Sequence, residues 1–372
     1  MMVYNWVDQL VGICNHVLLS DNDNSVDISL PEMALDDWKE FFNQASLHGL
    51  LPIVIKFFES RKIEDDLLRE IILEWYGCAF TDRQNYQLQV SVMRDLAGMF
   101  SAEGVDVMFF KGATLAQIYP EPECRVFSDI DFYLYGQWQK GVDIMKRHGV
   151  EIIPFSHHHI RASYHSILLE NHYDFLERVN HRENLMLDDE LKKLAEKEGR
   201  TIRARFLGDE ITNAYVMTPT MNAVFLMRHM ATHFVAETIS LRMLYDWALF
   251  LKCQVWDVDW AIAVQLYKKS GMVKFISIVQ GLLVSHLSME TPDCPVKPLT
   301  GDTTDRVWES IINPPAANPH KEKSWAFYLY EAKVFVNNRW KHWIVYPDES
   351  FLLLFIRHTW SVLKNKCGKW ER

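Results

Sequence analysis

The spacing of apolar residues changes twice along the chain, and this limits the folds that it can adopt. Up to about residue 95, apolar residues recur at helical spacing, as in WKEFFNQASLHGLLPIVIKFF, with no long alternating stretch. From Gly104 onward, short runs rich in β-branched and aromatic residues follow one another between turn residues: VDVMFFKG, SDIDFYLYG, YHSILLEN and YDFLERV. Helical periodicity returns after Pro219. A strand-rich stretch set between two helical ones predicts an α+β protein.

This pattern predicts three units. We expect a helical N-terminal segment over residues 1–95, a small α/β domain with a mixed sheet over 96–215, and a helical C-terminal domain over 216–372. Prolines cluster near 289–323, and we expect a long exposed loop there rather than a domain boundary, because a segment rich in aromatic residues follows it. With 372 residues, 49% of them hydrophobic, the chain can bury a large core.

The net charge and the spacing of the cysteines limit the partners and the cellular compartment that we expect. A net charge of −10 gives no basic footprint across the chain, so nucleic acid is not an expected partner. The six cysteines are far apart and form no CxxC pair, which argues against a disulfide framework or a zinc knuckle. No apolar run approaches the roughly 18 to 20 residues that span a bilayer, and the N-terminus lacks the basic region of a leader. We therefore expect a cytoplasmic protein without membrane contact.

Two aspartates, Asp129 and Asp131, stand one residue apart on the predicted strand SDIDFYLYG. Because side chains alternate along a strand, both carboxylates point to one face and share one site. Such a pair raises a pKa or requires a cation, and a hard divalent ion such as Mg²⁺ removes the conflict. The alternative is that one aspartate caps a turn while the other is exposed at a sheet edge. The context favours the ion, because a turn at Gly112 and the helix-like ATLAQIY come directly before the acid strand.

The stretch FFKGATLAQIYPEPECRVFSDIDFYL resembles the signature of an uncharacterised nucleotidyltransferase family of bacterial proteins, type five, within the polymerase-β-like superfamily. The likeness runs from about residue 90 to near the end, through YDFLERV, SLRMLYDWALFLK, VDWAIAVQLYKKSG and WIVYPDESFLLLFI. It implies a small mixed-sheet nucleotidyltransferase domain flanked by helical segments. The positions that match the signature are Lys111, Gly112, Tyr119, Pro120, Arg125, Asp129 and Asp131.

The resemblance also implies an activity, namely Mg²⁺-dependent transfer of a nucleoside monophosphate from an NTP to a hydroxyl acceptor. Asp129 and Asp131 would bind one or two Mg²⁺ ions, and the acceptor would be an unidentified small molecule or protein. Lys111 and Arg125 would each contact phosphate or form a structural ion pair. The expected nucleotide-binding positions are Lys111, Gly112, Ala113, Thr114, Arg125 and Ser128.

Asp174 is the candidate third carboxylate, as metal ligand or general base. We expect YHSILLENHYDFLERV to form a hairpin that turns at Asn171 and His172 and brings Asp174 beside the acid pair. Glu170 and Glu177 are its rivals. On a regular strand Glu177 faces away from Asp174, so the two cannot both serve.

Two departures from the family pattern keep other functions open. Ala113 follows Gly112 where the wider superfamily has Gly-Ser or Gly-Gly, and Leu176 stands where relatives often have His. A non-catalytic, antitoxin-like module that binds a nucleotide or a partner on the same fold is therefore the main alternative. A metal-dependent phosphohydrolase that uses water as its acceptor is a third hypothesis.

Other polar motifs have structural interpretations. Arg242 and Asp246, four residues apart on a predicted helix, are expected to pair. His229 and His233 have metal-like spacing but lack the glutamate of a zincin helix, so we expect a satisfied or exposed pair. The run SHHHI, residues 156–160, is expected to be a loop.

Overall fold

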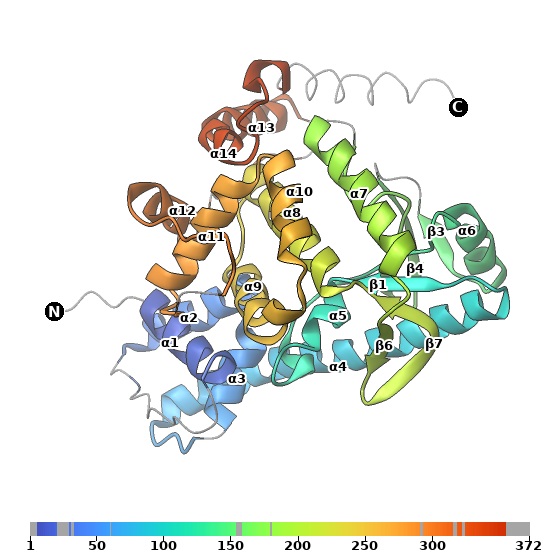
Figure 1. Ribbon diagram of the computed structural model, residues 1–372. Coiled ribbons are helices and arrows are strands. Elements are labelled where there is room, and N and C mark those ends of the chain that lie inside the picture. The colour runs from blue at the N-terminus through green and yellow to red at the C-terminus, as the bar shows by residue number, and fades with distance from the viewer. Residues whose placement is uncertain are drawn as a thin grey trace.

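The molecule consists of a mixed β-sheet set among helices (Figure 1). The computed structural model describes residues 6–20, 30, 33–59, 61–153, 158–178, 181–290, 293–314, 318–321 and 324–354. Its α-helices are α1 (Trp6–Leu18), α2 (Leu35–Leu47), α3 (Leu51–Glu59), α4 (Asp66–Ala102), α5 (Gly112–Ala116), α6 (Trp138–Arg147), α7 (Arg182–Glu198), α8 (Pro219–Ala236), α9 (Leu241–Gln254), α10 (Trp260–Lys269), α11 (Val273–Ser285), α12 (Asp302–Ile312), α13 (Trp325–Asn337) and α14 (Arg339–Val345). Two short 3₁₀ helices are η1 (Pro122–Cys124) and η2 (Val255–Asp257).

The sheet has seven strands in the order β3-β4-β5-β2-β1-β7-β6. Strand β2 lies beside β1 in antiparallel and beside β5 in parallel orientation, and β1 also pairs with β7 in parallel. A mixed sheet with flanking helices confirms the predicted α+β class. The strands are β1 (Val107–Phe110), β2 (Asp129–Tyr133), β3 (Glu151–Ile153), β4 (His159–Tyr164), β5 (Ile167–His172), β6 (Arg203–Phe206) and β7 (Asp209–Val216).

The two faces of the sheet belong to two hydrophobic cores. On one face Ile130 and Phe132 pack against the long helix α4, where the rings of Phe100 and Phe132 lie 5.6 Å apart. On the other face Phe110 packs against Phe225 of α8, with ring centroids 5.3 Å apart. Alternation along β1 and β2 thus points every second side chain, Asp129 and Asp131 included, toward the side of α8.

Helices from both ends of the chain share the second of these cores. Phe41 of α2 and Val54 of α3 lie in the same buried cluster as Leu244 of α9 and Phe275 of α11. Helix α4 runs without interruption through the boundary predicted at residues 95 and 96. The division into three units remains a prediction, with this shared core linking the outer two.

Local sequence signals begin the two helices that frame the sheet. The side chain of Asp65 accepts hydrogen bonds from the backbone N–H groups of Leu67 and Leu68, which caps α4. Helix α8 begins at Pro219, the first-turn position that proline favours, after the cap residue Thr218. Within the described ranges, no helix is long and apolar enough to cross a membrane.

The hairpin of β4 and β5 turns at His165 and Ser166, so the predicted turn at Asn171 and His172 is wrong. Both turn residues have positive φ, 49° and 64°, which is the geometry of a type I′ turn. Sequence reasoning missed it because such turns usually carry Asn-Gly. Asn171 and His172 instead end β5, and residues 173–178 of YDFLERV follow the strand rather than forming one.

The proline-rich segment also differs from the expectation. A loop is expected near 289–323, but helix α12 (Asp302–Ile312) lies within it. Its buried residues are Thr304, Val307, Trp308 and Ile311, which is the spacing of one helix face. Because prolines flank it on both sides, this short amphipathic pattern was not recognised as a helix in the sequence.

Candidate active site

The site is built where three strands lie side by side. Asp131 on β2 is the register partner of Phe110 on β1 and of Glu170 on β5. Because paired residues of neighbouring strands point to the same face, the Glu170 carboxylate joins those of Asp129 and Asp131. We call Asp129, Asp131 and Glu170 the acid cluster.

Two basic side chains meet the acid cluster at Asp131. Lys111 Nζ lies 2.7 Å from Asp131 Oδ1, and His172 Nε2 lies 2.8 Å from the same oxygen. Possible ligand atoms of Asp131, Glu170 and His172 all lie within 4.8 Å of one another. Asp131 is 1% exposed and His172 0%, so these contacts are made out of water.

The surroundings shift the carboxyl pKa values in opposite directions. Burial, with repulsion from Asp131, raises the pKa of Asp129 to about 6. Burial also acts to raise the pKa of Asp131, but the adjacent Lys111 charge outweighs it and holds that pKa well below its usual range. For Glu170, burial is likewise outweighed, chiefly by the adjacent His159 imidazole, and its pKa is lowered. Asp129 and Asp131 therefore differ in pKa, although they are only two residues apart.

The acid cluster fits a divalent cation. Asp131 Oδ2 is buried and has no hydrogen-bond partner among the described residues. Leaving such an oxygen unpaired is costly, and a bound cation would satisfy it. Carboxylate oxygens are the ligands that hard divalent ions prefer, and an imidazole nitrogen is available beside them. Asp131 and Glu170, with His172 beside them, are therefore the described residues that could hold the ion, and Asp129 points to the same face of the sheet.

The turn before α5 is shaped around Lys111 and Gly112. Lys111 has φ 53° and ψ −138°, an unusual conformation for a residue with a side chain. Gly112 has φ 23°, and a Cβ there would lie 2.9 Å from the Phe127 ring. Thr114 Oγ1 donates a hydrogen bond of 2.7 Å to the carbonyl of Lys111. The turn therefore requires glycine and aims Lys111 at Asp131.

The other expected nucleotide-binding positions differ in access. Ala113 is buried in the core on the α4 side of the sheet. Ser128 is exposed and comes directly before Asp129. Of these two, Ser128 presents its side chain to solvent beside the acid cluster.

Arg125 is buried in a structural ion pair. Its Nε and Nη2 donate hydrogen bonds of 2.7 and 2.8 Å to the two oxygens of Asp246 on α9, and its Nη1 donates to the Gly112 carbonyl at 3.0 Å. Tyr119 and Arg242 also donate to Asp246, which confirms the predicted pairing of Arg242 with Asp246. With its nitrogens so engaged, Arg125 supports the Gly112 turn from behind.

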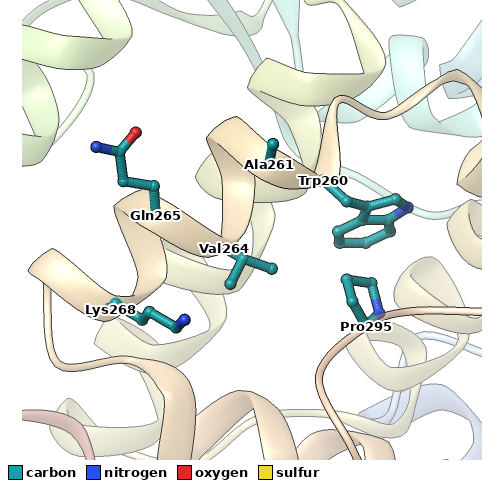
Figure 2. A pocket seen from close by; sticks show the side chains of 6 residues that line it. All are labelled: Trp260, Ala261, Val264, Gln265, Lys268 and Pro295. Carbon is teal, nitrogen blue, oxygen red and sulfur yellow. The ribbon is translucent and has the colours of Figure 1, made fainter.

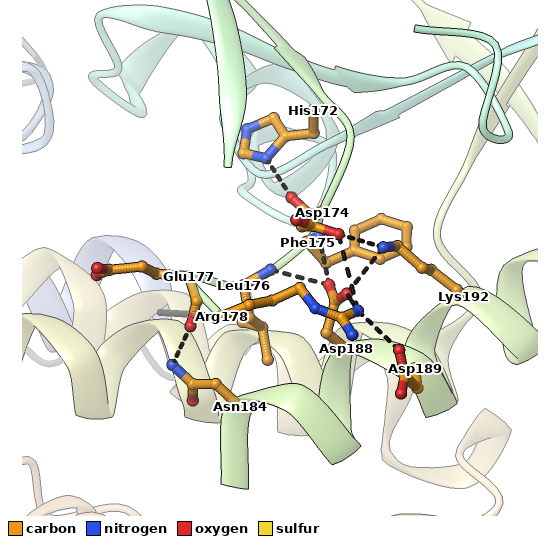
Figure 3. Close-up of polar contacts among 10 residues, drawn as sticks. All are labelled: His172, Asp174, Phe175, Leu176, Glu177, Arg178, Asn184, Asp188, Asp189 and Lys192. Carbon is orange, nitrogen blue, oxygen red and sulfur yellow. Dashed lines mark hydrogen bonds and ion pairs between the residues drawn. The ribbon is translucent and has the colours of Figure 1, made fainter. Parts of the chain in front are cut away.

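Asp174 lies outside the acid cluster. Its carboxylate pairs with Lys192 of α7 and lies 3.8 Å from Arg178, in a network that includes Asp188 (Figure 3). Only its backbone carbonyl reaches toward the site, where it lies 3.1 Å from His172 Nδ1. The misplaced hairpin turn is the reason, because β5 ends at His172 and the chain bends before Asp174.

Glu177 and Leu176 also lie beyond β5. The backbone carbonyl of Glu177 accepts a hydrogen bond from Asn184, and the backbone N–H of Leu176 donates to Asp188 (Figure 3). The segment that the sequence suggested as an acid-bearing strand is therefore bound to α7. Glu170, the other rival of Asp174, is the third carboxylate that the sheet brings to Asp131.

Helix α8 lies over the face of the sheet that carries the acid cluster. Lys111 Nζ lies 5.6 Å from the Phe225 ring centroid, and the Phe225 ring stacks on His229 at 5.8 Å. Burial and the nearby Lys111 charge hold the pKa of His229 well below its usual range. His233 is exposed, and the two imidazoles lie 4.5 Å apart. Both imidazoles therefore lie on the side of α8 that is near the Lys111 charge.

Three histidines of the site are not among the site residues predicted from the sequence. His159 is on β4, with Nε2 3.2 Å from Glu170 Oε1, and the His158 ring lies 5.3 Å from that of His172. The expectation of a loop through 156–160 is thus wrong at His159 and Ile160, while residues 156 and 157 lie outside the described ranges. One sequence signal could have placed His172 in the site. Glu170 and His172 are two residues apart, as Asp129 and Asp131 are, and this spacing puts both side chains on one face of a strand.

A separate hollow lies on α10. Figure 2 shows Trp260 and Pro295 facing each other across it. Its lining residues are Trp260, Ala261, Val264, Gln265, Lys268 and Pro295. It shares no residue with the acid cluster and contains no group of carboxylates or imidazoles, so we assign it no chemistry.

The fold and the site together define an α+β protein with a buried carboxylate cluster on a mixed sheet. The family follows from sequence comparison, since a family model described as an uncharacterised nucleotidyltransferase matches residues 35–287, more than half of the chain. The chain belongs to this family, which confirms the resemblance and supports a general role in nucleotidyl transfer. No curated protein and no solved structure matches the chain.

Proposed function

We propose that this protein transfers a nucleoside monophosphate from an NTP to a hydroxyl group of a small molecule or a protein, with a divalent cation such as Mg²⁺. The observation that carries the proposal is the convergence of Asp129, Asp131 and Glu170 from neighbouring strands, with the orphaned Asp131 Oδ2 among them. In this proposal Glu170, rather than Asp174, is the third carboxylate. The cation, as one or two ions, would neutralise phosphate charge and align the α-phosphate.

We further propose that the triphosphate lies over the turn of Lys111 and Gly112. Lys111 is placed between the acid cluster and Phe225 of α8, so its ammonium group can bind a phosphate oxygen while staying near Asp131. Thr114 holds the turn through the Lys111 carbonyl, and Ser128 is exposed beside Asp129. Arg125 is a positioning residue that fixes the Gly112 carbonyl.

The chemistry needs one proton acceptor. The acceptor oxygen attacks the α-phosphorus, the bond from that phosphorus to the bridging oxygen breaks, and pyrophosphate leaves. Asp129 is less buried than Asp131 and Glu170, so an acceptor hydroxyl can reach it and transfer its proton there. Asp131 and Glu170 lie deeper and serve to hold the cation.

One observation favours the main alternative, a binding module without catalysis. The Lys111 ammonium already neutralises Asp131 without a cation, and such a site could persist in a protein that no longer turns over nucleotide. A nucleotide-binding or partner-binding role on the same fold would then remain.

Label transfer separates these possibilities. The pure protein is incubated with ATP, CTP, GTP or UTP labelled at the α-phosphate, with Mg²⁺ or Mn²⁺ and a cell extract as the source of acceptors. We expect label to move onto one acceptor, and this transfer to be lost in Asp131→Asn but kept in Asp95→Asn, an exposed aspartate of α4. Nucleotide binding without transfer for all four NTPs would favour the binding module.

A further inference from the structure

The hydrogen bonds of His172 contain a donor-acceptor conflict. Nδ1 lies 3.1 Å from the backbone carbonyl of Asp174, and a carbonyl oxygen can only accept, so Nδ1 carries the hydrogen. In the neutral ring Nε2 is then a bare lone pair. Yet Nε2 lies 2.8 Å from Asp131 Oδ1, a carboxylate oxygen that also only accepts. Two lone pairs therefore face each other in a place where both side chains are buried.

A shared cation resolves this conflict geometrically. Neighbouring ligands at right angles around an ion, each about 2.1 Å from it, lie about 3 Å apart, close to the observed separation of Nε2 and Oδ1. Glu170 Oε2 lies 3.7 Å from the same nitrogen, and the free Asp131 Oδ2 adds another oxygen. The three side chains could thus meet one ion with modest movement.

The surroundings of His172 are those of a metal ligand. A coordinating histidine nearly always donates its second N–H to a carbonyl or carboxylate, as Nδ1 does toward Asp174. The Phe110 ring packs edge-on at 4.9 Å and fixes the imidazole plane. His159 in turn lies 3.2 Å from Glu170 and orients the carboxylate beside it.

We propose that His172 Nε2 is a direct ligand of the active-site cation, together with Asp131 and Glu170, and that this cation is a first-row transition ion of the Mn²⁺ type. Imidazole binds such ions well, whereas Mg²⁺ prefers oxygen ligands alone. This inference rests on the proposed function for the identity of the site, and it refines the choice of metal there.

The test is pulsed electron paramagnetic resonance on the full chain loaded with one equivalent of Mn²⁺, without nucleotide. We expect the spectrum to show coupling to ¹⁴N from a bound imidazole. His172→Asn should abolish the coupling, because its amide can still reach the Asp174 carbonyl but lacks an Nε2. It should also weaken Mn²⁺ binding by at least about tenfold, the lower end of what loss of even an outer-shell partner costs, with a smaller effect on Mg²⁺.

His158→Asn and His159→Asn are the matched controls, because both rings lie near His172 yet are not assigned as ligands. Both should retain the nitrogen coupling. If His172→Asn fails to fold, the doubly substituted protein with His158 and His159 replaced, prepared with ¹⁵N-histidine, tests the same point. There the coupling should change to ¹⁵N frequencies.

Two results overturn the inference, namely bound Mn²⁺ without nitrogen coupling, or coupling that survives in His172→Asn. Either would show that His172 Nε2 does not bind the cation. The proposed reaction is judged separately by label transfer. Transfer without nitrogen coupling removes only the present inference, and nitrogen coupling without transfer removes only the proposed reaction.

Discussion

Arg125 and Asp246 form a two-point ion pair across 121 positions of sequence, with nitrogen-oxygen distances of 2.7 and 2.8 Å. Arg125 follows η1, Asp246 is on α9, and both are buried. Because Arg125 also holds the Gly112 carbonyl, this one pair links the C-terminal helices to the turn that carries Lys111. The position of Lys111 therefore depends on a buried ion pair behind the turn.

Replacing Arg125 by Ala should destabilise the protein by about 3 to 5 kcal/mol, because Asp246 would remain buried with much of its pairing lost. Urea unfolding at neutral pH measures this. Arg147→Ala is the matched control, since its pair with Glu103 is largely exposed and should contribute no more than about 1 kcal/mol. Equal losses of unfolding free energy in the two variants would show that the buried pair stabilises the protein no more than the exposed pair does.

The backbone of Lys111 provides a second prediction. At φ 53° and ψ −138° a side chain is strained, and such conformations cost on the order of 1 to 3 kcal/mol. Lys111→Gly and Lys111→Ala both remove the ion pair with Asp131, but only glycine relieves the strain. We expect the Gly variant to be more stable than the Ala variant by that amount, with nucleotide affinity reduced in both.

Thermal unfolding and calorimetry with a non-hydrolysable NTP measure these two effects. An Ala variant as stable as the Gly variant would mean that the turn relaxes to an ordinary conformation. Wild-type nucleotide affinity in both variants would place the phosphates away from Lys111.

The sequence predicted those parts of the fold and site that depend on local pattern. Helical periodicity, short strands and the alternation that aligns Asp129 with Asp131 are all local, and the structure contains them. The third carboxylate depended on the register of a hairpin, and its turn, His165 and Ser166, has neither glycine nor asparagine. Distant contacts such as Arg125 with Asp246 left no signal in a single sequence.

The carboxylates of the acid cluster should differ in their effect on the cation-free protein. Asp129→Asn removes a like charge beside Asp131 and Glu170, so with chelator present it should raise the melting temperature. Asp131→Asn should lower it, because the part-buried Lys111 ammonium loses its anionic partner. Both variants should lose cation-dependent turnover, since Asp131→Asn removes an anionic ligand and Asp129→Asn removes the proposed proton acceptor.

Differential scanning calorimetry with and without Mg²⁺ or Mn²⁺ measures this contrast. The exposed Asp95→Asn is again the control, and should behave as the wild type under both conditions. A cation that stabilises Asp131→Asn as much as the wild type would place the metal elsewhere.

A pair of glutamates between the start of α7 and the C-terminal helices predicts a pH dependence of stability. Glu349 lies 2.7 Å from His181 Nδ1 and accepts a hydrogen bond from the Arg182 backbone at 3.0 Å. These contacts outweigh the effect of burial and lower the pKa of Glu349. Burial and the adjacent Glu349 carboxylate raise the pKa of Glu183 to about 7. At pH values between the ordinary pKa of a glutamate and this raised pKa, the folded protein thus keeps a proton on Glu183 that the unfolded chain releases.

The raised pKa of Glu183 therefore adds stability that is fully present below about pH 4.5, the ordinary pKa of a glutamate, and lost as pH rises through about 7. Glu183→Gln keeps the neutral shape at every pH. We expect its melting temperature to match the wild type at pH 4.5 and to exceed it at pH 8, with the difference growing between these values. Glu196→Gln, an exposed position on the same helix, is the control, because it should show no growing difference. A Glu183→Gln curve parallel to the wild type from pH 4.5 to 8 would mean that Glu183 is ionised in the folded protein throughout.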